Sequence, residues 1–201
     1  MLGRIPAARQ AIIDRIARIA RRTRPKGMPV APDLFARCFY HGVSELDLGS
    51  RRPEDLAGAA LAEFELGRVR RSGRSLVRVF NPDSGKDGFA STHTVIMVVT
   101  DDMPFLVDSL GMVCTQNGLA VHLLAHPVFS VVRDGRGRLR GVHLDDPPPG
   151  AKQESWQLIE IDREPDARRL AAIESSIRRT LEDVRAATGD WRRMRAARSA
   201  S

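Results

Sequence analysis

Asp101 and Asp102 are adjacent carboxylates, and they are the first candidates for a chemical role in this sequence. They lie in the sequence TDDMPFLVDSLG, between a β-branched apolar run and an apolar helical pattern. The run THTVIMVVT at residues 92–100 is typical of a strand that is buried on both faces. The turn at residues 101–106 therefore joins a buried strand to a helix, and the two acids stand where that helix begins.

These acids have a structural interpretation. Asp102 precedes Pro104 by two residues, and this spacing predicts that Asp102 is the N-cap, accepting a hydrogen bond from a backbone N–H of the first helical turn. Pro104 then lies in that first turn, where its missing N–H leaves nothing unsatisfied. Asp101 adds negative charge at the positive end of the helix dipole. In this interpretation the acids start the helix and perform no reaction.

The same turn also has the form of a ligand site. A helix N-terminus at the end of a buried strand offers free N–H groups, which bind carboxylates and phosphates. Two acids at this end repel a phosphate compound and accept an ammonium group, so an amino acid is the favoured ligand. The candidate effector site consists of Asp101, Asp102, Met103, Pro104, Phe105 and Leu106.

Histidines offer the other candidate chemistry. His122 and His126 share a face, but in a strand they lie roughly 13 Å apart, too far to hold one metal ion. His93 and His122 can approach each other across neighbouring strands, with the paired acids nearby, and would then form a His–Asp pair for proton transfer. No nucleophile accompanies that pair. We therefore predict neither a metal site nor a catalytic site.

Motifs that bind cofactors are missing from the sequence. No G-x-G-x-x-G follows a predicted strand, because Gly135-Arg136-Gly137 belongs to a hairpin turn, and there is no P-loop. Lys26, Lys86 and Lys152 are the only lysines, and all three fall in predicted loops rather than in apolar surroundings that would make a catalytic base. We expect this chain to hold no cofactor.

The net charge of +7 raises the alternative of nucleic-acid binding. The arginines are dispersed and interleaved with acids, and aromatic residues make up only 5% of the chain, so a solvated basic surface is the favoured interpretation. No apolar run reaches the roughly 20 residues that span a bilayer. We expect a cytoplasmic protein in which Cys38 and Cys114 are buried thiols.

The N-terminal third is predicted to be helical. Residues 1–22 form a basic amphipathic helix and lack the apolar core and cleavage site of a secretory signal. Prolines and a glycine interrupt the pattern at residues 23–32. Two further helical patterns, PDLFARCFYHGV and PEDLAGAALAEFELGRVRR, make residues 23–73 a helical section.

Residues 74–190 are predicted to form a separate α+β domain. Their order is strand, strand, helix, strand, strand, strand, helix, which fits an antiparallel sheet with both helices on one face. One long strand is expected at residues 119–134, with Pro127 at an edge or a bulge. Gly189 is expected to end the last helix, and residues 191–201 are predicted to be a basic flexible tail.

The central segments of this domain resemble a known family. The strand VIMVVT, the turn Asp102-Met103-Pro104 and a helix ending in Asn117-Gly118-Leu119 look like the opening of an ACT domain. That family has a ferredoxin-like βαββαβ fold, commonly binds amino acids and regulates metabolic enzymes. Its usual pattern has Gly directly after the proline, where this chain has Phe105. A Phe side chain fills space that a ligand would use, so the turn either binds an effector or packs against neighbouring domains.

A wider resemblance is carried by DDMPFLVDS and HLLAHPV, with support from FARCFYHGVSELDLGSRRPEDLAGAALAEFELGR and ESWQLIEID. Together they are similar to the N-terminal region of the large bacterial NAD-dependent glutamate dehydrogenases, over roughly residues 33–190. The resemblance implies a parent enzyme that converts glutamate and NAD to 2-oxoglutarate, ammonia and NADH. It implies that this chain is a regulatory and structural piece without the catalytic centre, that NAD binds elsewhere, and that its partners are other domains or subunits in a homo-oligomer.

Overall fold

The N-terminal section is helical, as the sequence predicts. The computed structural model describes residues 6–23, 25, 27–143 and 147–199, with side chains as far as residue 189. The first helices are α1 (Ala7–Arg22), α2 (Pro32–Phe39), α3 (Glu45–Gly49) and α4 (Pro53–Gly67). Pro32 and Pro53 occupy the first positions of their helices, where a proline costs no hydrogen bond.

The rest of the chain forms one antiparallel sheet with further helices. The strands are β1 (Leu76–Phe80), β2 (Thr94–Asp101), β3 (Val121–Ala125), β4 (Val128–Arg133), β5 (Leu139–His143) and β6 (Lys152–Ile161). Their order is β1-β2-β6-β4-β5, and β3 also pairs with β6. The helices are α5 (Ser84–Asp87), α6 (Leu106–Gln116) and α7 (Ala167–Ser199). The predicted α+β class is confirmed.

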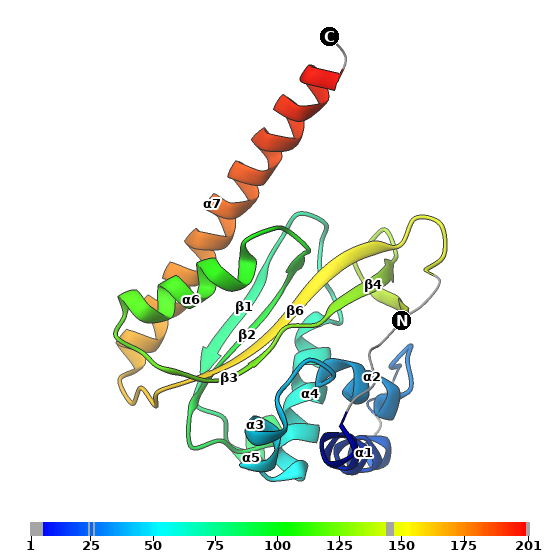
Figure 1. The fold of residues 1–201 in the computed structure, drawn as a ribbon, viewed down its shortest axis with the longest axis vertical. Coiled ribbons are helices and arrows are strands. Elements are labelled where there is room, and N and C mark those ends of the chain that lie inside the picture. The colour runs from blue at the N-terminus through cyan, green and yellow to red at the C-terminus, as the bar shows by residue number, and fades with distance from the viewer. Residues whose placement is uncertain (1–5, 24, 26, 144–146, 200–201) are drawn as a thin grey trace.

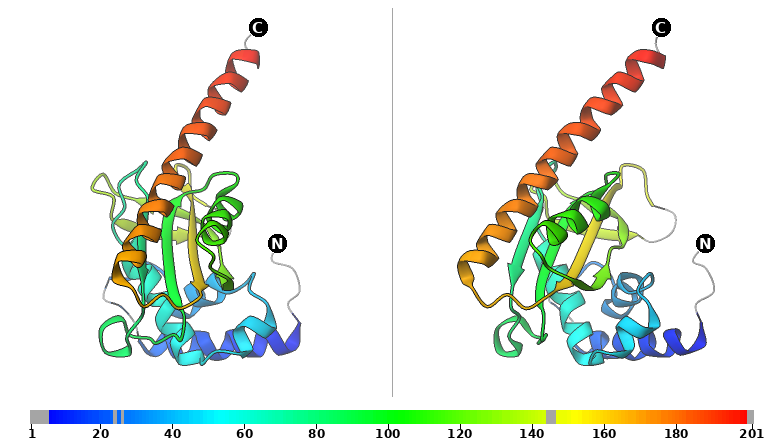
Figure 2. Two further views of the ribbon diagram at one scale, coloured as in Figure 1. Left: turned by 90° about the vertical axis from the view of Figure 1, so that its left-hand side faces the viewer. Right: turned by 60° about the vertical axis from the view of Figure 1, so that its left-hand side comes forward.

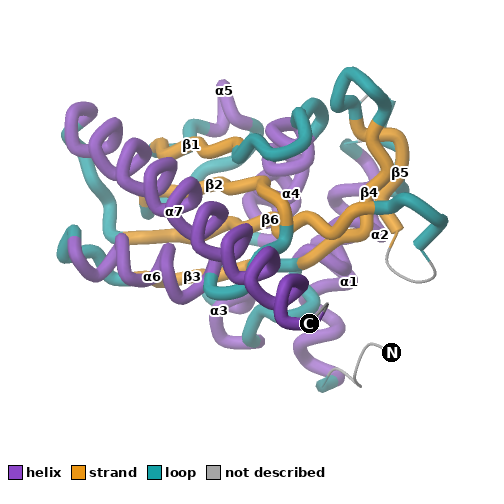
Figure 3. Tube along the Cα trace, turned by 90° about the horizontal axis from the view of Figure 1, so that it is seen from above, coloured by secondary structure: helices purple, strands orange, loops and turns teal. Residues whose placement is uncertain are grey.

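Helices cover both faces of this sheet (Figures 1 and 2). On one face lie α6 and α7, as the sequence predicts, and on the opposite face lie α1 to α4. Seen from above, α7 crosses over the strands, and its C-terminal part extends beyond the sheet (Figures 1 and 3). The N-terminal helices therefore form a third layer that shares the sheet, rather than an appendage beside it.

An aromatic core joins the N-terminal helices to the sheet. The ring centroid of Phe35, in α2, lies 5.2 Å from that of Phe129 and 5.7 Å from that of Trp156. Phe64 of α4 meets Phe35 edge to face at 5.7 Å. All four rings are at most 1% exposed, so burial of their large apolar surfaces is the main force that holds this layer in place.

The opposite face of the sheet has an aliphatic core under α6 and α7. Its members include Ile96, Val98, Leu110, Ile159 and Ile177. Neighbouring residues of β2 point alternately into the two cores, because successive side chains of a strand lie on opposite faces. This double burial explains the nearly continuous apolar run in the sequence of β2, and it confirms the prediction of a strand buried on both faces.

The long strand predicted at residues 119–134 is divided in two. β3 and β4 follow one another along the same edge of β6, and His126 and Pro127 separate them. Proline has no N–H to donate to the ladder, but its carbonyl still accepts a hydrogen bond of 3.0 Å from the backbone N–H of Trp156. The expected bulge at Pro127 is thus a bend between two strands that share one partner.

The edges of the sheet at β1 and at β3 differ. Beyond β1, α7 supplies side chains to the free backbone groups: Arg178 donates to the carbonyl of Val77 at 2.6 Å, and Glu174 accepts from the N–H of Val79 at 3.1 Å. β3 pairs with β6 on one side, and no further strand of the described residues pairs with its other side. An unpaired edge readily takes up another strand, so β1 is protected and β3 is open.

Three details differ from the predictions. Gly189 does not end the last helix, because the backbone of α7 remains helical to Ser199. Lys86 lies in α5 and Lys152 begins β6, so these lysines are not in loops, and Lys26 lies outside the described residues.

In the part of the chain that the structure describes, no helix has the length and apolar character that crossing a membrane requires.

Candidate functional site

The turn at residues 101–106 connects β2 to α6. The ladder between β2 and β6 continues one residue past the strand, because the Asp102 N–H donates to the carbonyl of Gln153 at 3.0 Å. Helix α6 then begins at Leu106, and its N-cap residue is Phe105. The prediction that Asp102 caps the helix is therefore wrong: pairing with β6 holds Asp102 in the sheet, three residues before the N-cap position.

Phe105 has an unusual backbone conformation. Its φ is 67°, and within the described residues it is the only non-glycine residue with positive φ. An L-residue in this left-handed region costs roughly 1 kcal/mol or more, whereas glycine adopts it freely. Phe105 occupies the position where the ACT pattern has Gly, so the turn keeps the glycine geometry with a bulky side chain. That side chain is 70% exposed.

Buried neighbours hold this strained turn in place. Met103 and Leu106 are 9% and 4% exposed and belong to the aliphatic core between the sheet and α6 and α7. Pro104 lies between them and is exposed. Two apolar anchors therefore fix the backbone on either side of Pro104 while the Phe105 ring faces outward.

Asp101 forms ion pairs with two arginines of the same chain. Its Oδ1 accepts a hydrogen bond of 2.6 Å from Arg70, and its Oδ2 lies 3.5 Å from Arg185 of α7. Arg70 is 1% exposed although it is charged. Asp101 thus links the end of β2 to a buried arginine and to α7, and only Asp102 keeps an exposed carboxylate at the turn.

A cavity of about 380 Å³ lies beside the turn, between α6 and α7. Phe105, Ser109 and Met112 line one side, and Asp183 and Thr188 line the other. The exposed Phe105 residue lines this opening, Asp102 lies three residues before it in the chain, and α6 begins at the residue that follows it. Together they offer an apolar surface, a negative charge for an ammonium group and N–H donors for a carboxylate.

His93 and His122 do approach each other across the sheet, as predicted. Their ring centroids lie 4.3 Å apart. The acid beside them is Asp162, whose Oδ1 is 2.7 Å from the Nε2 of His122. The expected pairing with Asp101 or Asp102 is wrong, because Asp101 lies at the far end of β2 from His93.

Hydrogen bonds and burial shift the pKa values of Asp162 and His93 in this cluster. The backbone N–H of Ala120 and the imidazole of His122 lower the pKa of Asp162. Burial lowers the pKa of His93, and the neighbouring Glu160 only partly offsets this. Glu160 itself accepts hydrogen bonds from Arg51 at 2.5 Å and from Ser91 at 2.8 Å. The cluster is thus a polar contact between the N-terminal helices and the sheet.

The spacing of His122 and His126 places them on and just after β3. Within the described residues, no group of three or more His, Cys, Asp or Glu side chains is arranged to hold a metal ion. The two cysteines lie in different cores: Cys38 packs against the aromatic core and Cys114 is buried in the aliphatic one. Burial raises the pKa of the Cys114 thiol, which makes it an unreactive core residue.

Comparison with known families decides what kind of module this is. The family described as "Glutamate dehydrogenase, ACT1 domain" matches residues 35–177, which include α2 to α6, all the strands and the first part of α7. The chain belongs to this family. The predicted resemblance to ACT domains and to glutamate dehydrogenases is confirmed by this match.

The glutamate dehydrogenase ACT1 chain has long relatives. It is 39% identical over 165 residues to an NAD-specific glutamate dehydrogenase of Halomonas elongata, and 38% identical over 168 residues to one of Pseudomonas aeruginosa. These alignments cover 82% and 81% of this chain and 10% of each relative. The chain thus spans about a tenth of the length of the curated relatives that it matches. No solved structure matches it.

Proposed function

We infer that this ACT1 chain is a regulatory and structural N-terminal module of an NAD-dependent glutamate dehydrogenase. The parent enzyme would oxidise glutamate with NAD to 2-oxoglutarate, ammonia and NADH, in the cytoplasm, with glutamate and NAD bound in another part of the protein. The proposal rests on the family match over residues 35–177 and on two relatives named as NAD-specific glutamate dehydrogenases. The absence of a dinucleotide-binding motif from the sequence supports a non-catalytic role.

Turnover measurements test the non-catalytic role. The 201-residue chain, supplied with glutamate and NAD, is expected to form no NADH above the rate without protein. The same assay on the longer parent enzyme serves as the positive control. Measurable NADH formation by the 201-residue chain would overturn the assignment.

The proposed effector is a free amino acid at the turn formed by residues 101–106. Its ammonium group would face the exposed carboxylate of Asp102, and its carboxylate would face the first N–H groups of α6. Its side chain would contact the exposed ring of Phe105, beside the cavity between α6 and α7.

Binding to this turn is testable with each of the twenty amino acids. A ligand that binds only the folded state raises the melting temperature. For any amino acid that does so, Asp102→Asn is expected to weaken the Kd by about tenfold, which corresponds to 1.4 kcal/mol for a lost charged contact. Glu182→Gln, an exposed charge change on α7, is the matched control. If no amino acid shifts the melting temperature, the turn has only a packing role.

The proposed partners are other domains or subunits of the parent enzyme. The open edge of β3 and the groove beside α6 support this, because Val121 and Met112 are 45% and 60% exposed there. An apolar groove next to a strand with one open edge is a ready site for a second sheet. A homo-oligomer formed this way would dissociate in Val121→Lys, as measured by light scattering after size exclusion.

Nucleic-acid binding remains the alternative from another class. Many of the arginines that give the chain its positive charge are in ion pairs with carboxylates; these include Arg37, Arg51, Arg70, Arg78, Arg133, Arg140, Arg178 and Arg185. Paired arginines have fewer N–H donors left for phosphates. Binding to random-sequence DNA that weakens steeply with salt would favour this alternative over the regulatory module.

A further inference from the structure

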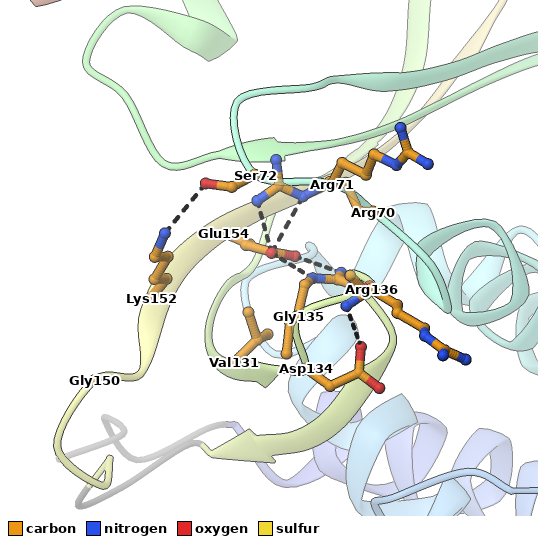
Figure 4. A pocket seen from close by; sticks show the side chains of 12 residues that line it. Arg70, Arg71, Ser72, Val131, Asp134, Gly135, Arg136, Gly150, Lys152 and Glu154 are labelled. Atoms are coloured by element: carbon orange, nitrogen blue, oxygen red, sulfur yellow. Dashed lines mark hydrogen bonds and ion pairs between the residues drawn. The ribbon is translucent and has the colours of Figure 1, made fainter.

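A basic pocket lies at the other end of the Arg70 network from the candidate effector turn. It has a volume of about 630 Å³ and lies between the hairpin of β4 and β5, the start of β6 and the turn that follows Arg70. Five cationic side chains line it, against two carboxylates; the lining includes Arg70, Arg71, Arg133, Arg136, Lys152, Asp134 and Glu154. Figure 4 shows the pocket from close by.

Glu154 forms the floor of the pocket and is 1% exposed. Its Oε1 accepts hydrogen bonds from Arg70 at 2.7 and 3.1 Å and from Arg133 at 2.7 Å. Its Oε2 accepts from Arg133 at 2.8 Å and from the indole N–H of Trp156 at 3.2 Å. A single carboxylate thus accepts hydrogen bonds from two guanidinium groups and an indole.

The buried network has more positive than negative groups. The guanidinium groups of Arg70, Arg133 and Arg185 share the carboxylates of Glu154 and Asp101. Burial alone lowers the pKa of Arg70, but its hydrogen bonds and ion pairs with Glu154 and Asp101 outweigh burial and raise it. Among the described residues, this network therefore contains three guanidinium groups and two carboxylates, one more basic group than acidic groups.

Arg133 also has donors left for a ligand. A guanidinium carries five N–H groups, and the described contacts of Arg133 use three of them, two to Glu154 and one to the carbonyl of Gly137 at 3.0 Å. By contrast, Arg70 has four contacts: two to Glu154, one to Asp101 and one to the Arg74 carbonyl. Arg133 is accordingly the residue of the floor that can bind an incoming group.

The rim of the pocket adds further positive charge. Lys152 reaches across to the hydroxyl of Ser72, with 3.1 Å between Nζ and Oγ, and this contact spans one side of the opening (Figure 4). Arg71 and Arg136 extend away from Glu154 on the other side (Figure 4) and are exposed. The carboxylate of Asp134 offsets little of this charge, because it is bound by Arg140 and by the backbone N–H groups of Arg136 and Arg138.

We propose that this pocket binds a small dianion whose charged groups are phosphate or carboxylate. One oxyanion group would accept from the spare N–H groups of Arg133 and from Lys152 and Ser72, and would balance the excess of basic over acidic groups among the described residues of the network. Guanidinium groups bind both oxyanions in the same forked geometry, so the chemistry is shared by phosphate esters and dicarboxylates. The site is separate from the effector turn, and its test is independent of the proposed function.

Thermal stability of the 201-residue chain at constant ionic strength provides the test. Pyrophosphate and inorganic phosphate probe the phosphate arm, succinate probes the dicarboxylate arm, and sodium chloride supplies the ionic-strength control. We expect one arm to raise the melting temperature at millimolar concentration while chloride does not. Lys152→Gln should then weaken the Kd of that anion by about tenfold, and Lys86→Gln, on the exposed helix α5, should leave it unchanged.

A second readout separates binding from a change in folding. In a Trp191→Phe background, Trp156 is the only indole, and its N–H contacts Glu154. Anion binding to Arg133 should shift Trp156 emission at saturation, with the same Kd as the thermal measurement. Ser72→Ala, a small change at the rim, should weaken binding while leaving the unliganded emission as it was. The proposal is overturned if no anion exceeds the chloride control, or if Lys152→Gln and Lys86→Gln bind alike.

Discussion

The two faces of the sheet hold the protein together in different ways. On the α6 and α7 face, aliphatic side chains from a regular α+β arrangement pack in one layer. On the α1 to α4 face, Phe35, Phe64, Phe129 and Trp156 form an aromatic core, and Glu63 of α4 is also buried there. The comparison teaches that the N-terminal helices and the sheet share one hydrophobic core, which contains side chains from both.

The largest expected effect comes from emptying the centre of the aromatic core. Phe35→Ala should lower the free energy of unfolding by about 3–5 kcal/mol, as measured by chemical denaturation. Leu34→Ala, on the exposed side of the same helix, should cost under about 0.5 kcal/mol. If helical circular dichroism and Trp156 fluorescence then give separate transitions, residues 23–73 fold apart from residues 74–190, and the view of one shared unit is wrong.

Gly→Ala substitutions on the two faces of the sheet should change the stability of the protein in opposite directions. At Gly67 in α4, a Cβ would lie 2.3 Å from the Trp156 ring, so Gly67→Ala should destabilise by about 1–3 kcal/mol. At Gly111 in α6, nothing lies within 4 Å of an added Cβ, so Gly111→Ala should stabilise the helix by roughly 0.5–1 kcal/mol. Denaturation midpoints measure both, and equal signs would contradict the difference in packing between the faces.

Glu63, on the aromatic face, should make the stability of the folded protein depend on pH. It is fully buried, and neither carboxylate oxygen has a hydrogen-bond partner within the described residues. Burial raises the pKa of Glu63 well above its ordinary value, and the nearby Val98 backbone offsets only part of this. The folded state therefore keeps a proton that the unfolded state releases, and stability falls as pH rises above the ordinary pKa of glutamate.

Removing the ionisable group should remove that dependence. Glu63→Gln is expected to be more stable than the wild type at pH 8, and the difference should shrink toward pH 4.5. Glu63→Met should gain a further amount, on the order of 1 kcal/mol, because the unsatisfied polar atoms are also gone. Thermal unfolding across this pH range measures both, and a gap that widens toward acid would contradict the assignment.

The smallest effect lies on the aliphatic face, at the strained turn. Phe105→Gly should stabilise the chain by about 0.5–1 kcal/mol, because glycine adopts positive φ without steric cost. Phe105→Ala keeps the Cβ and so keeps the strain, which makes it the matched control. Equal stability of the two variants would mean that the turn costs nothing and that Phe105 is kept for another reason.

Local patterns predicted the elements of this fold but not the contacts between them. The strand buried on both faces, the hairpin near Gly135 and the helical N-terminal section all follow from short stretches of sequence. The inward face of α2 does not, because Leu34, Phe35, Cys38 and Phe39 form one broad apolar stripe, and only packing against the sheet decides that the two phenylalanines are buried while Leu34 is 44% exposed.

The contacts at the turn and around the histidines were less predictable, because they too depend on pairing between elements that are distant in sequence. Asp102 has the spacing of an N-cap, but a tertiary hydrogen bond to Gln153 keeps it in the sheet. Arg70 and Glu154 are 84 residues apart in sequence, and no local pattern marks either as buried. Asp162 could have been placed near His122, since both lie at the ends of neighbouring predicted strands, but this requires knowing that those strands pair.

The unequal protection of the two sheet edges limits how copies of this chain can associate. Arg178 and Glu174 occupy the backbone groups of β1, so a neighbouring strand cannot add there without displacing α7. Strand addition at the β1 edge is therefore blocked, whereas the β3 edge remains available. Two copies that met through β3 would pair the same edge of each chain, which gives a closed two-fold contact with no β3 edge left for a third copy.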